Sequence, residues 1–190
     1  ISGLTIEGTD AGKYYLIQPE TTADITARPL TVTADTDTKE YNRSTASDGV
    51  PTLTSGVVQS GDSVNWTQTF DNWNVGTSKI LTPAGVVTDG NSGNNYSYTY
   101  TPVSTGAITV KPITVTPDSG QTKIYNKAGS DPTLTYATVP PDLESGDSLS
   151  GALARAAGTN VGSYAIDLGT LANSNYDISL SVTPVNFSIT

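Results

Sequence analysis

Cysteine, methionine and histidine are all missing from this sequence of 190 residues. Without cysteine there are no disulfide bonds, no thiolate nucleophiles and no zinc-thiolate sites. Without histidine there is no Ser-His-Asp triad and no imidazole ligand for a metal ion. The commonest catalytic and metal-binding groups are therefore excluded before any pattern is considered.

Basic residues are scarce as well. Nine Lys and Arg residues stand against 18 Asp and Glu, so the formal net charge is -9. Nucleic acids and anionic membranes both attract clustered basic residues, so neither is expected as a partner. No apolar run approaches the roughly 18 residues of a membrane span, and we expect no membrane insertion. The first residues lack a basic and an apolar region, which indicates an internal segment of a longer protein.

The residues that are abundant favour strands and turns. Thr, Ser, Gly and Asn take the place of Lys and Glu, which makes the sequence poor in helix formers. Apolar and polar residues alternate with period two in 30–34, 96–100 and 178–182, as expected for half-buried strands. Residues 149–157 look helix-like, but the corresponding segment 66–70 of an internal repeat is strand-like. We predict strands in both, and an all-β fold.

The chain repeats itself in order. Residues 28–33 (RPLTVT) recur as 111–116 (KPITVT), and five more blocks recur after them in the same order. These further pairs are TKEYN 38–42 with TKIYN 122–126, PTLT 51–54 with 132–135, SGDSV 60–64 with SGDSL 145–149, NVGT 74–77 with NVGS 160–163, and NY 95–96 with 175–176. Ordered blocks of this kind indicate tandem domains.

The repeats divide the chain into a tail and two units. Residues 28–110 form the first unit and 111–190 the second, with a short linker expected at 106–112. Residues 1–27 match the end of a unit, since Tyr14 and Ile25 correspond to Tyr96 and Ile108. We expect this tail of a preceding repeat to add strands near the first unit, or else to be partly loose.

The repeated blocks resemble the tandem YDG and MBG repeats of large bacterial surface adhesins, including filamentous-haemagglutinin-like proteins. The second unit resembles an MBG repeat through 123–126 (KIYN), 131–136 (DPTLTY), 145–149 (SGDSL) and 160–166 (NVGSYAI). The first unit resembles a YDG repeat through 28–32 (RPLTV) and 39–42 (KEYN). It departs from the family pattern at Asn42, where Asp is usual, and at Arg43, where Gly is usual. The resemblance implies a stalk or adhesive segment of a secreted, cell-attached protein.

For the fold we expect two elongated domains of antiparallel strands in line, sandwich-like, with a β-grasp-like unit as the alternative. Packing between neighbouring units should contribute to stability, because a unit of this size has a small core of its own. The prolines that follow Arg28 and Lys111 should restrict the hinge at each junction, since proline fixes φ.

Candidate sites are few. Trp66 and Trp73, with Asn65, Asn72 and Asn74, are a candidate sugar-binding patch or else part of a core or domain junction. Tyr41, Tyr96, Tyr125 and Tyr176 recur at matched positions, which is typical of core tyrosines. Asp35 with Asp37, and Asp142, Glu144 and Asp147, are interpreted as turn residues rather than a calcium site or a hydrolase pair. A Lys-Asn crosslink between Lys39 or Lys123 and Asn42 or Asn126, as surface adhesins sometimes carry, is also considered.

We therefore expect a non-enzymatic stalk or spacer on the bacterial cell surface, without cofactor or metal. Its partners would be the neighbouring repeats of the parent chain. The alternative is a module that binds host glycans or mucin through Trp66 and Trp73.

Overall fold

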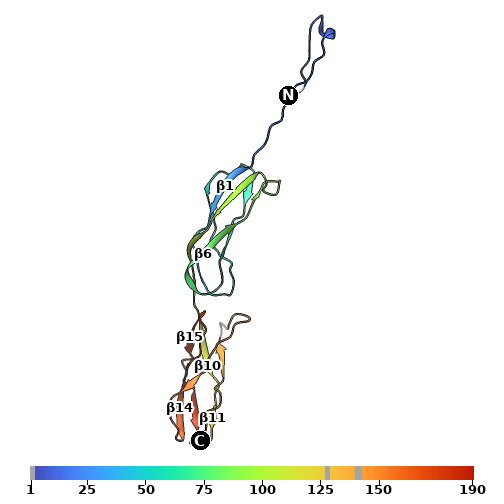
Figure 1. The fold of residues 1–190 in the computed structure, drawn as a ribbon. Coiled ribbons are helices and arrows are strands. Elements are labelled where there is room, and N and C mark those ends of the chain that lie inside the picture. The colour runs from blue at the N-terminus through green and yellow to red at the C-terminus, as the bar shows by residue number, and fades with distance from the viewer. Residues whose placement is uncertain (1–2, 127–128, 140–142) are drawn as a thin grey trace.

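The computed structural model describes residues 3–126, 129–139 and 143–190 (Figure 1). Regular structure in these residues consists of strands and one 3-10 turn, η1 (Ala11–Lys13). The all-β fold expected from the sequence is confirmed. Over the described ranges, no helix has the length and apolar composition needed to cross a membrane.

The first domain is built from three small sheets. Its strands are β1 (Arg28–Thr33), β2 (Thr38–Glu40), β3 (Thr52–Ser55), β4 (Ser63–Val64), β5 (Thr67–Phe70), β6 (Gly76–Ala84), β7 (Val87–Thr88), β8 (Tyr96–Thr101) and β9 (Val103–Thr109). Strands β3, β1 and β8 form one sheet in that order, β2, β9, β6 and β5 form another, and β4 pairs with β7. Burial alternates along β5 and β6 because successive side chains point to opposite faces of a sheet.

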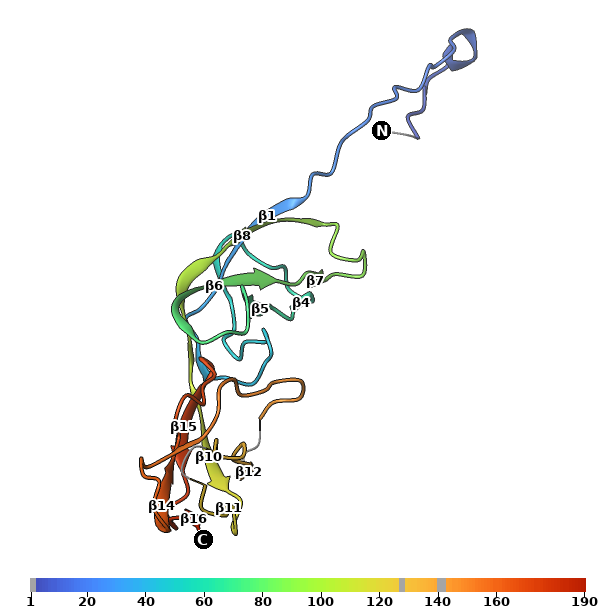
Figure 2. The same cartoon turned by 60° about the horizontal axis from the view of Figure 1, so that its bottom comes forward.

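The second domain repeats this plan. Its strands are β10 (Lys111–Pro117), β11 (Thr122–Lys123), β12 (Tyr136–Val139), β13 (Ala154–Arg155), β14 (Gly162–Asp167), β15 (Tyr176–Leu180) and β16 (Asn186–Ile189). The order β12-β10-β15 matches β3-β1-β8, and β11-β16-β14-β13 matches β2-β9-β6-β5. Figures 1 and 2 show the two domains one after the other along the length of the molecule.

Most strand pairs are antiparallel, as expected from the sequence, but the sheets are mixed and each domain also contains parallel pairs. Strand β1 pairs parallel with β8, and β10 pairs parallel with β15. The short strands β2 and β11 also pair parallel with β9 and β16. Alternating residues predict which face of a strand is buried, but they do not predict the direction of its neighbour. The parallel pairs join the beginning of each domain to its end, so both ends of each domain are fixed by sheet hydrogen bonds.

Residues 106–112, where a short linker was expected, do not form a loop but lie almost entirely in strands. Strand β9 ends at Thr109 and β10 begins at Lys111, so Val110 alone separates the last strand of one domain from the first strand of the next. Pro112 lies inside β10, where it pairs with Asp177 of β15. Strand pairing therefore continues on both sides of the junction with almost no free chain between.

Three clusters of buried side chains form the interior. One lies in the first domain and contains Leu30, Val32, Trp66, Val87 and Tyr96. Another lies in the second domain and contains Val115, Leu134, Leu153, Ile166, Leu171, Phe187 and Ile189. The third contains residues of both domains, namely Ala34, Tyr41, Phe70, Leu81 and Ile108 with Ile113 and Tyr176. The hydrophobic interior thus crosses the domain junction.

The described part of the tail, residues 3–27, contains no strand, and it runs away from the first domain in Figures 1 and 2. Of the two outcomes considered from the sequence, added strands are not seen. Most apolar side chains of this segment are exposed, including Tyr15 and Ile25 at 90% and 98%. None of them belongs to the three clusters.

Candidate functional site

The two tryptophans that were considered as a sugar-binding patch, or else as part of a core or junction, differ in exposure. Trp66 is 8% exposed and packs edge-on against Tyr98, with ring centroids 6.1 Å apart. Trp73 is 45% exposed and lies in the turn between β5 and β6. Because one indole is buried before β5 and the other is half-exposed after it, the two do not form one exposed patch. Asn65 is exposed beside Trp66, whereas the side chain of Asn74 accepts a hydrogen bond from Asn175 of the second domain.

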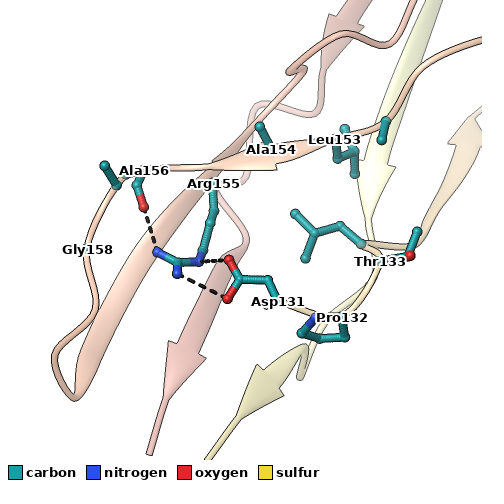
Figure 3. A pocket seen from close by; sticks show the side chains of 11 residues that line it. Asp131, Pro132, Thr133, Leu153, Ala154, Arg155, Ala156 and Gly158 are labelled. Atoms are coloured by element: carbon teal, nitrogen blue, oxygen red, sulfur yellow. Dashed lines mark hydrogen bonds and ion pairs between the residues drawn. The ribbon is translucent and has the colours of Figure 1, made fainter. Parts of the chain in front are cut away.

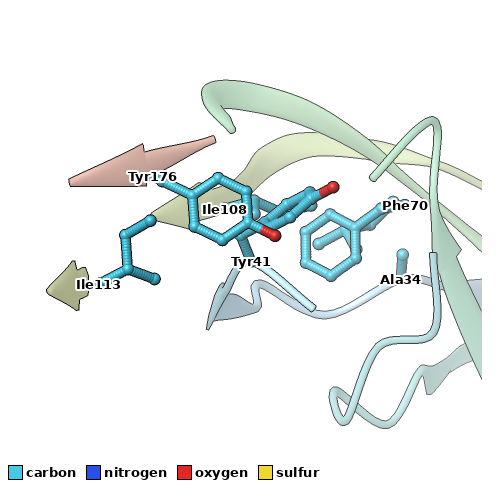
Figure 4. Close-up of a cluster of buried hydrophobic side chains, with 7 residues drawn as sticks. Ala34, Tyr41, Phe70, Ile108, Ile113 and Tyr176 are labelled. Carbon is cyan, nitrogen blue, oxygen red and sulfur yellow. The ribbon is translucent and has the colours of Figure 1, made fainter. Parts of the chain in front are cut away.

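Polar side chains converge instead at the junction between the two domains. The hydroxyls of Tyr41 and Tyr176 each donate a hydrogen bond of 2.7 Å to Oδ2 of Asp147. Their rings meet edge to face, with centroids 5.4 Å apart and planes at 74°. Figure 4 shows Ile113 beside this pair on the second-domain side and Phe70 on the first-domain side. We call Tyr41, Arg43, Asp147 and Tyr176 the junction cluster.

Sheet pairing places both tyrosines at facing domain ends. Tyr41 follows β2, and its amide donates to the Thr109 carbonyl at the end of β9 (2.9 Å). Tyr176 begins β15, opposite Lys111 at the start of β10. Since only Val110 separates β9 from β10, the two rings are brought together across the joint.

A tight turn presents the carboxylate of Asp147. The Asp147 amide donates to the Glu144 carbonyl (2.9 Å), and Gly146 between them has a φ of +87°. Such a φ strains any residue with a side chain, and a Cβ on Gly146 would also collide with the Arg43 guanidinium. The repeated Ser-Gly-Asp block is therefore a turn that aims one carboxylate at the neighbouring domain.

Arg43 lies in the bend that follows Tyr41. It takes a φ of +53°, in the left-handed region that glycine adopts freely. Its Nε lies 3.5 Å from Oδ1 of Asp147, and its Nη1 donates to the Ser145 carbonyl. The arginine thus keeps the turn and adds a charged contact to the second domain.

A second set of polar contacts lies beside the cluster. Asn175 accepts a hydrogen bond from the Val75 amide (3.0 Å) and donates one to the Asn74 side chain (3.2 Å). Lys111 forms an ion pair with Glu144, and the Glu144 amide donates to the Tyr176 hydroxyl (2.8 Å). The junction therefore combines apolar packing with hydrogen bonds that fix its rotation.

The electrostatics of the cluster favour a fixed protonation state. Burial raises the pKa of Asp147, but the hydrogen bonds from Tyr41 and Tyr176 and the charges of Arg43 and Lys111 outweigh it, so the pKa lies below its ordinary value. Burial, followed by the hydrogen bond to Asp147, raises the pKa of Tyr41 to about 12. Burial and the Asp147 carboxylate also raise the pKa of Tyr176. At neutral pH both phenols keep their protons, which suits a structural contact rather than proton transfer.

The other carboxylates considered from the sequence are engaged in local contacts. Oδ1 of Asp35 accepts from the Thr36 amide, and Oδ2 of Asp37 accepts from Ser47 and Asp48. Asp142 lies outside the described residues. Within the described part of the chain, no three acidic side chains gather to hold a metal ion.

The lysines considered for a crosslink brace loops. Lys39 Nζ lies 3.0 Å from Oδ1 of Asn42, but it also donates to the carbonyls of Ser44 and Ala46. Lys123 Nζ donates to the Gly129 carbonyl and pairs with Asp131 at 2.6 Å. Both ammonium groups are held as hydrogen-bond donors to loops of their own domain.

An open pocket of about 380 Å³ lies in the second domain, between residues 131–134 and 152–158 (Figure 3). The Arg155 guanidinium binds both carboxylate oxygens of Asp131, at 2.8 and 3.2 Å. Hydrogen bonds from Arg155 and Lys123 lower the pKa of Asp131. Arg155 also lies over the rings of Tyr164 and Phe187. The Asp131 carboxylate is thus paired with two cations, Lys123 and Arg155, and is not free to act as an acid or a base.

The junction residues were not among the sites predicted from the sequence. Tyr41 and Tyr176 were assigned to a core, which is correct for their burial (1% and 6% exposed) but misses that two domains share this core. Tyr125 was assigned in the same way, and it is 47% exposed. The signal that could have found the site is the recurrence of both a tyrosine and the Ser-Gly-Asp turn in each unit.

Comparison with protein families gives two matches. Residues 26–104 match the YDG domain, and residues 113–187 match the MBG domain of the YGX type. The search of curated proteins and the search of solved structures each find no match to this chain. Val110, which joins β9 to β10, lies between the two matched regions.

Proposed function

Taking the chain as a YDG domain followed by an MBG domain, both repeat-type domains of bacterial surface proteins, we propose that it is a spacer. In this proposal it is a stalk segment of a secreted adhesin on the bacterial cell surface. The two domains hold a distal adhesive part of the parent protein away from the cell. The partners of each domain are its neighbouring repeats.

The observation that carries this proposal is the construction of the junction. Tyr41 and Tyr176 share the carboxylate of Asp147, Arg43 pairs with it, and Val110 alone links β9 to β10. Domains joined by flexible linkers and small polar interfaces move relative to one another by default. A short link together with a shared apolar core opposes that motion, as a spacer requires.

We propose further that the chain is not an enzyme. This rests on the state of its ionisable groups: Asp147, Asp131 and Glu144 are each paired with a cation of their own or the adjoining domain. Acid-base catalysis needs a group whose pKa lies near the working pH and that can reach a substrate. In the junction cluster the pKa of Asp147 is lowered and the pKa values of Tyr41 and Tyr176 are raised, so each moves further from neutral pH.

The alternative function, binding of host glycans or mucin, is narrowed to one indole. Trp66 belongs to the core of the first domain, so of the two indoles Trp73 is the one on which a sugar could stack. It is half-exposed at the tip of the β5–β6 turn, beside the exposed Asn72. A screen of glycans and mucins with the parent chain and with Trp73→Ala tests this directly. Binding that is lost in the variant would support the alternative, and binding that is kept would exclude Trp73.

The spacer function is tested by measuring height. The chain is displayed on cells between a membrane anchor and a fluorescent tag, and the distance of the tag from the membrane is measured. The double variant Tyr41→Phe, Asp147→Asn should bring the tag closer by allowing the joint to bend. Asp177→Asn, an exposed change of the same kind in the second domain, should leave the height unchanged. Equal heights for all three chains would contradict the proposal.

A further inference from the structure

The second-domain half of the junction has a counterpart at the far end of the first domain. The Tyr96 hydroxyl donates to Oδ2 of Asp62 (2.5 Å), as Tyr176 donates to Asp147. The Gln59 amide donates to the Tyr96 hydroxyl at 2.9 Å, as the Glu144 amide does to Tyr176. The first domain thus builds the same Tyr-Asp pair on the same kind of turn.

The neighbouring residues repeat as well. Arg28 begins β1 opposite Tyr96, just as Lys111 begins β10 opposite Tyr176. The Arg28 amide donates to the Asn95 carbonyl at 2.9 Å, matching Lys111 and Asn175 at 3.0 Å. The two domain ends therefore share a backbone frame and a cation at the first position.

The contacts of the two carboxylates differ. Asp147 accepts from tyrosines of both domains and pairs with Arg43 of the first. Among the described residues, Asp62 accepts from the tyrosine of its own domain, Tyr96. At Asp147 the adjoining domain supplies Tyr41 and Arg43. In the described part of the chain, no residue of another domain contacts Asp62 in this way.

The matching half lies at the other end of the chain. The Tyr125 amide donates to the Thr190 carbonyl at 2.7 Å, as the Tyr41 amide does to Thr109 at 2.9 Å. Both tyrosines follow a short strand that pairs parallel with the last strand of its domain. Yet Tyr125 is 47% exposed and Tyr41 is 1% exposed. Since the backbone positions agree, the difference comes from the domain that covers Tyr41.

We propose that Asp62 and Tyr96 form a docking site for the tyrosine loop of a second domain of this fold, joined in line immediately before Arg28. Tyr125 is the tyrosine by which this chain docks on the domain that follows it. The inference rests on the proposed spacer function and extends it. Each domain would carry a docking tyrosine at its last strand (Tyr41 or Tyr125) and an accepting carboxylate at its first strand (Asp62 or Asp147). Head-to-tail contacts of this kind leave one unpaired end of each type, to which a further domain can be added.

The tail supports the choice of occupant. Tyr14 and Ile25 correspond in the repeat to Tyr96 and Ile108, which lie in β8 and β9. The side chains of Tyr14 and Ile25 are exposed. Ala27 precedes Arg28 as Val110 precedes Lys111. A domain whose last strand ended near Thr26 would therefore meet β1 with the same one-residue link.

The test joins two copies of the chain so that Thr190 of the first copy is followed by Ala27 of the second. Because the chain has no cysteine, spin labels can be placed at Val182→Cys of the first copy and Val50→Cys of the second, both exposed positions. Electron spin resonance should give one narrow distance distribution across the new joint. Tyr125→Ala in the first copy should abolish it, whereas the same change in the second copy, at the free end, should not.

A broad distribution across the new joint, or a narrow one that survives Tyr125→Ala in the first copy, would overturn the inference. Labels at positions 50 and 182 of a single copy report the existing junction in the same fusion. If only the new joint is broad, the docking site is wrong and the spacer function stands. If both joints are broad, the spacer function itself fails.

Discussion

The Tyr41 hydroxyl and the Asp147 carboxylate, 106 positions apart in sequence, lie 2.7 Å apart across the domain junction. Asp147 also accepts from Tyr176 of its own domain, so one carboxylate oxygen joins two domains. Hydrogen bonds to a charged acceptor are stronger than those between neutral groups. The consequences of this contact for stability, pH and shape can each be measured.

Replacing Asp147 by Asn should weaken the junction at neutral pH. The amide nearly preserves the volume of the side chain but removes the charge that attracts both phenols and Arg43. We expect a loss of about 2 kcal/mol in the free energy of unfolding, the range for hydrogen bonds to charged groups, measured by urea denaturation.

The matched control for this change is Asp177→Asn, which alters the charge of the same domain at an exposed position. It should change the free energy of unfolding by less than about 0.5 kcal/mol, as surface substitutions usually do. Equal losses for the two variants would mean that the junction contributes no more than net charge.

Alkaline pH should loosen the junction before the rest of the molecule. The pKa of Tyr41 is raised from 10.0 to about 12 in the folded chain. Unfolded chains release this proton first as the pH rises, so the stabilisation is complete below about pH 10 and is lost toward about pH 12.

The measurement is the urea midpoint across this pH window for the parent chain and for Tyr41→Phe. Phenylalanine has no proton to lose, so the variant should start lower and fall less steeply. A parallel decline of both chains would show that Tyr41 does not carry the pH dependence.

The two tryptophans should differ sharply in their effect on stability. Trp66→Ala removes a buried indole from the core that contains Leu30 and Val87, and we expect it to cost about 3–5 kcal/mol. Trp73→Ala alters an exposed turn and should stay within about 0.5 kcal/mol of the parent. Thermal unfolding of both variants decides this, and similar melting temperatures would contradict the assignment of Trp66 to the core.

The ion pairs at Asp131 should respond to salt. Asp131→Asn breaks its contacts with Lys123 and Arg155, whose side chains are 13% and 10% exposed. We expect a loss of about 1 kcal/mol at low salt that shrinks as salt is added, because ion pairs near the surface are screened. Asp118→Asn, an exposed change in the same domain, is the control. A loss that is independent of salt would argue against an electrostatic cause.

Much of the fold follows from the sequence because its signals are local. Alternation in residues such as 30–34 identifies strands, and the ordered blocks identify two related domains. The parallel partners of β1 and β10 were missed because alternation carries no information on direction. The loop expected at 106–112 was missed because Gly106 and Pro112 look like breakers, whereas both lie inside strands.

The candidate site was mostly beyond the reach of the sequence. Trp66 and Trp73 are close in sequence, but the strand between them separates their side chains. Tyr41 and Asp147 are distant in sequence and meet only because parallel pairing brings the end of β2 beside the end of β9. The repeated Ser-Gly-Asp turn was visible, but its carboxylate faces a neighbouring domain, and a single unit does not reveal that neighbour.

The most direct test of the account is the distance between the two domains in solution. The absence of cysteine allows spin labels at Val50→Cys and Val182→Cys alone, one in each domain. The account predicts one narrow distance distribution in the parent chain that broadens when Tyr41→Phe and Asp147→Asn are combined. A broad distribution in the parent chain, unchanged in the double variant, would contradict it.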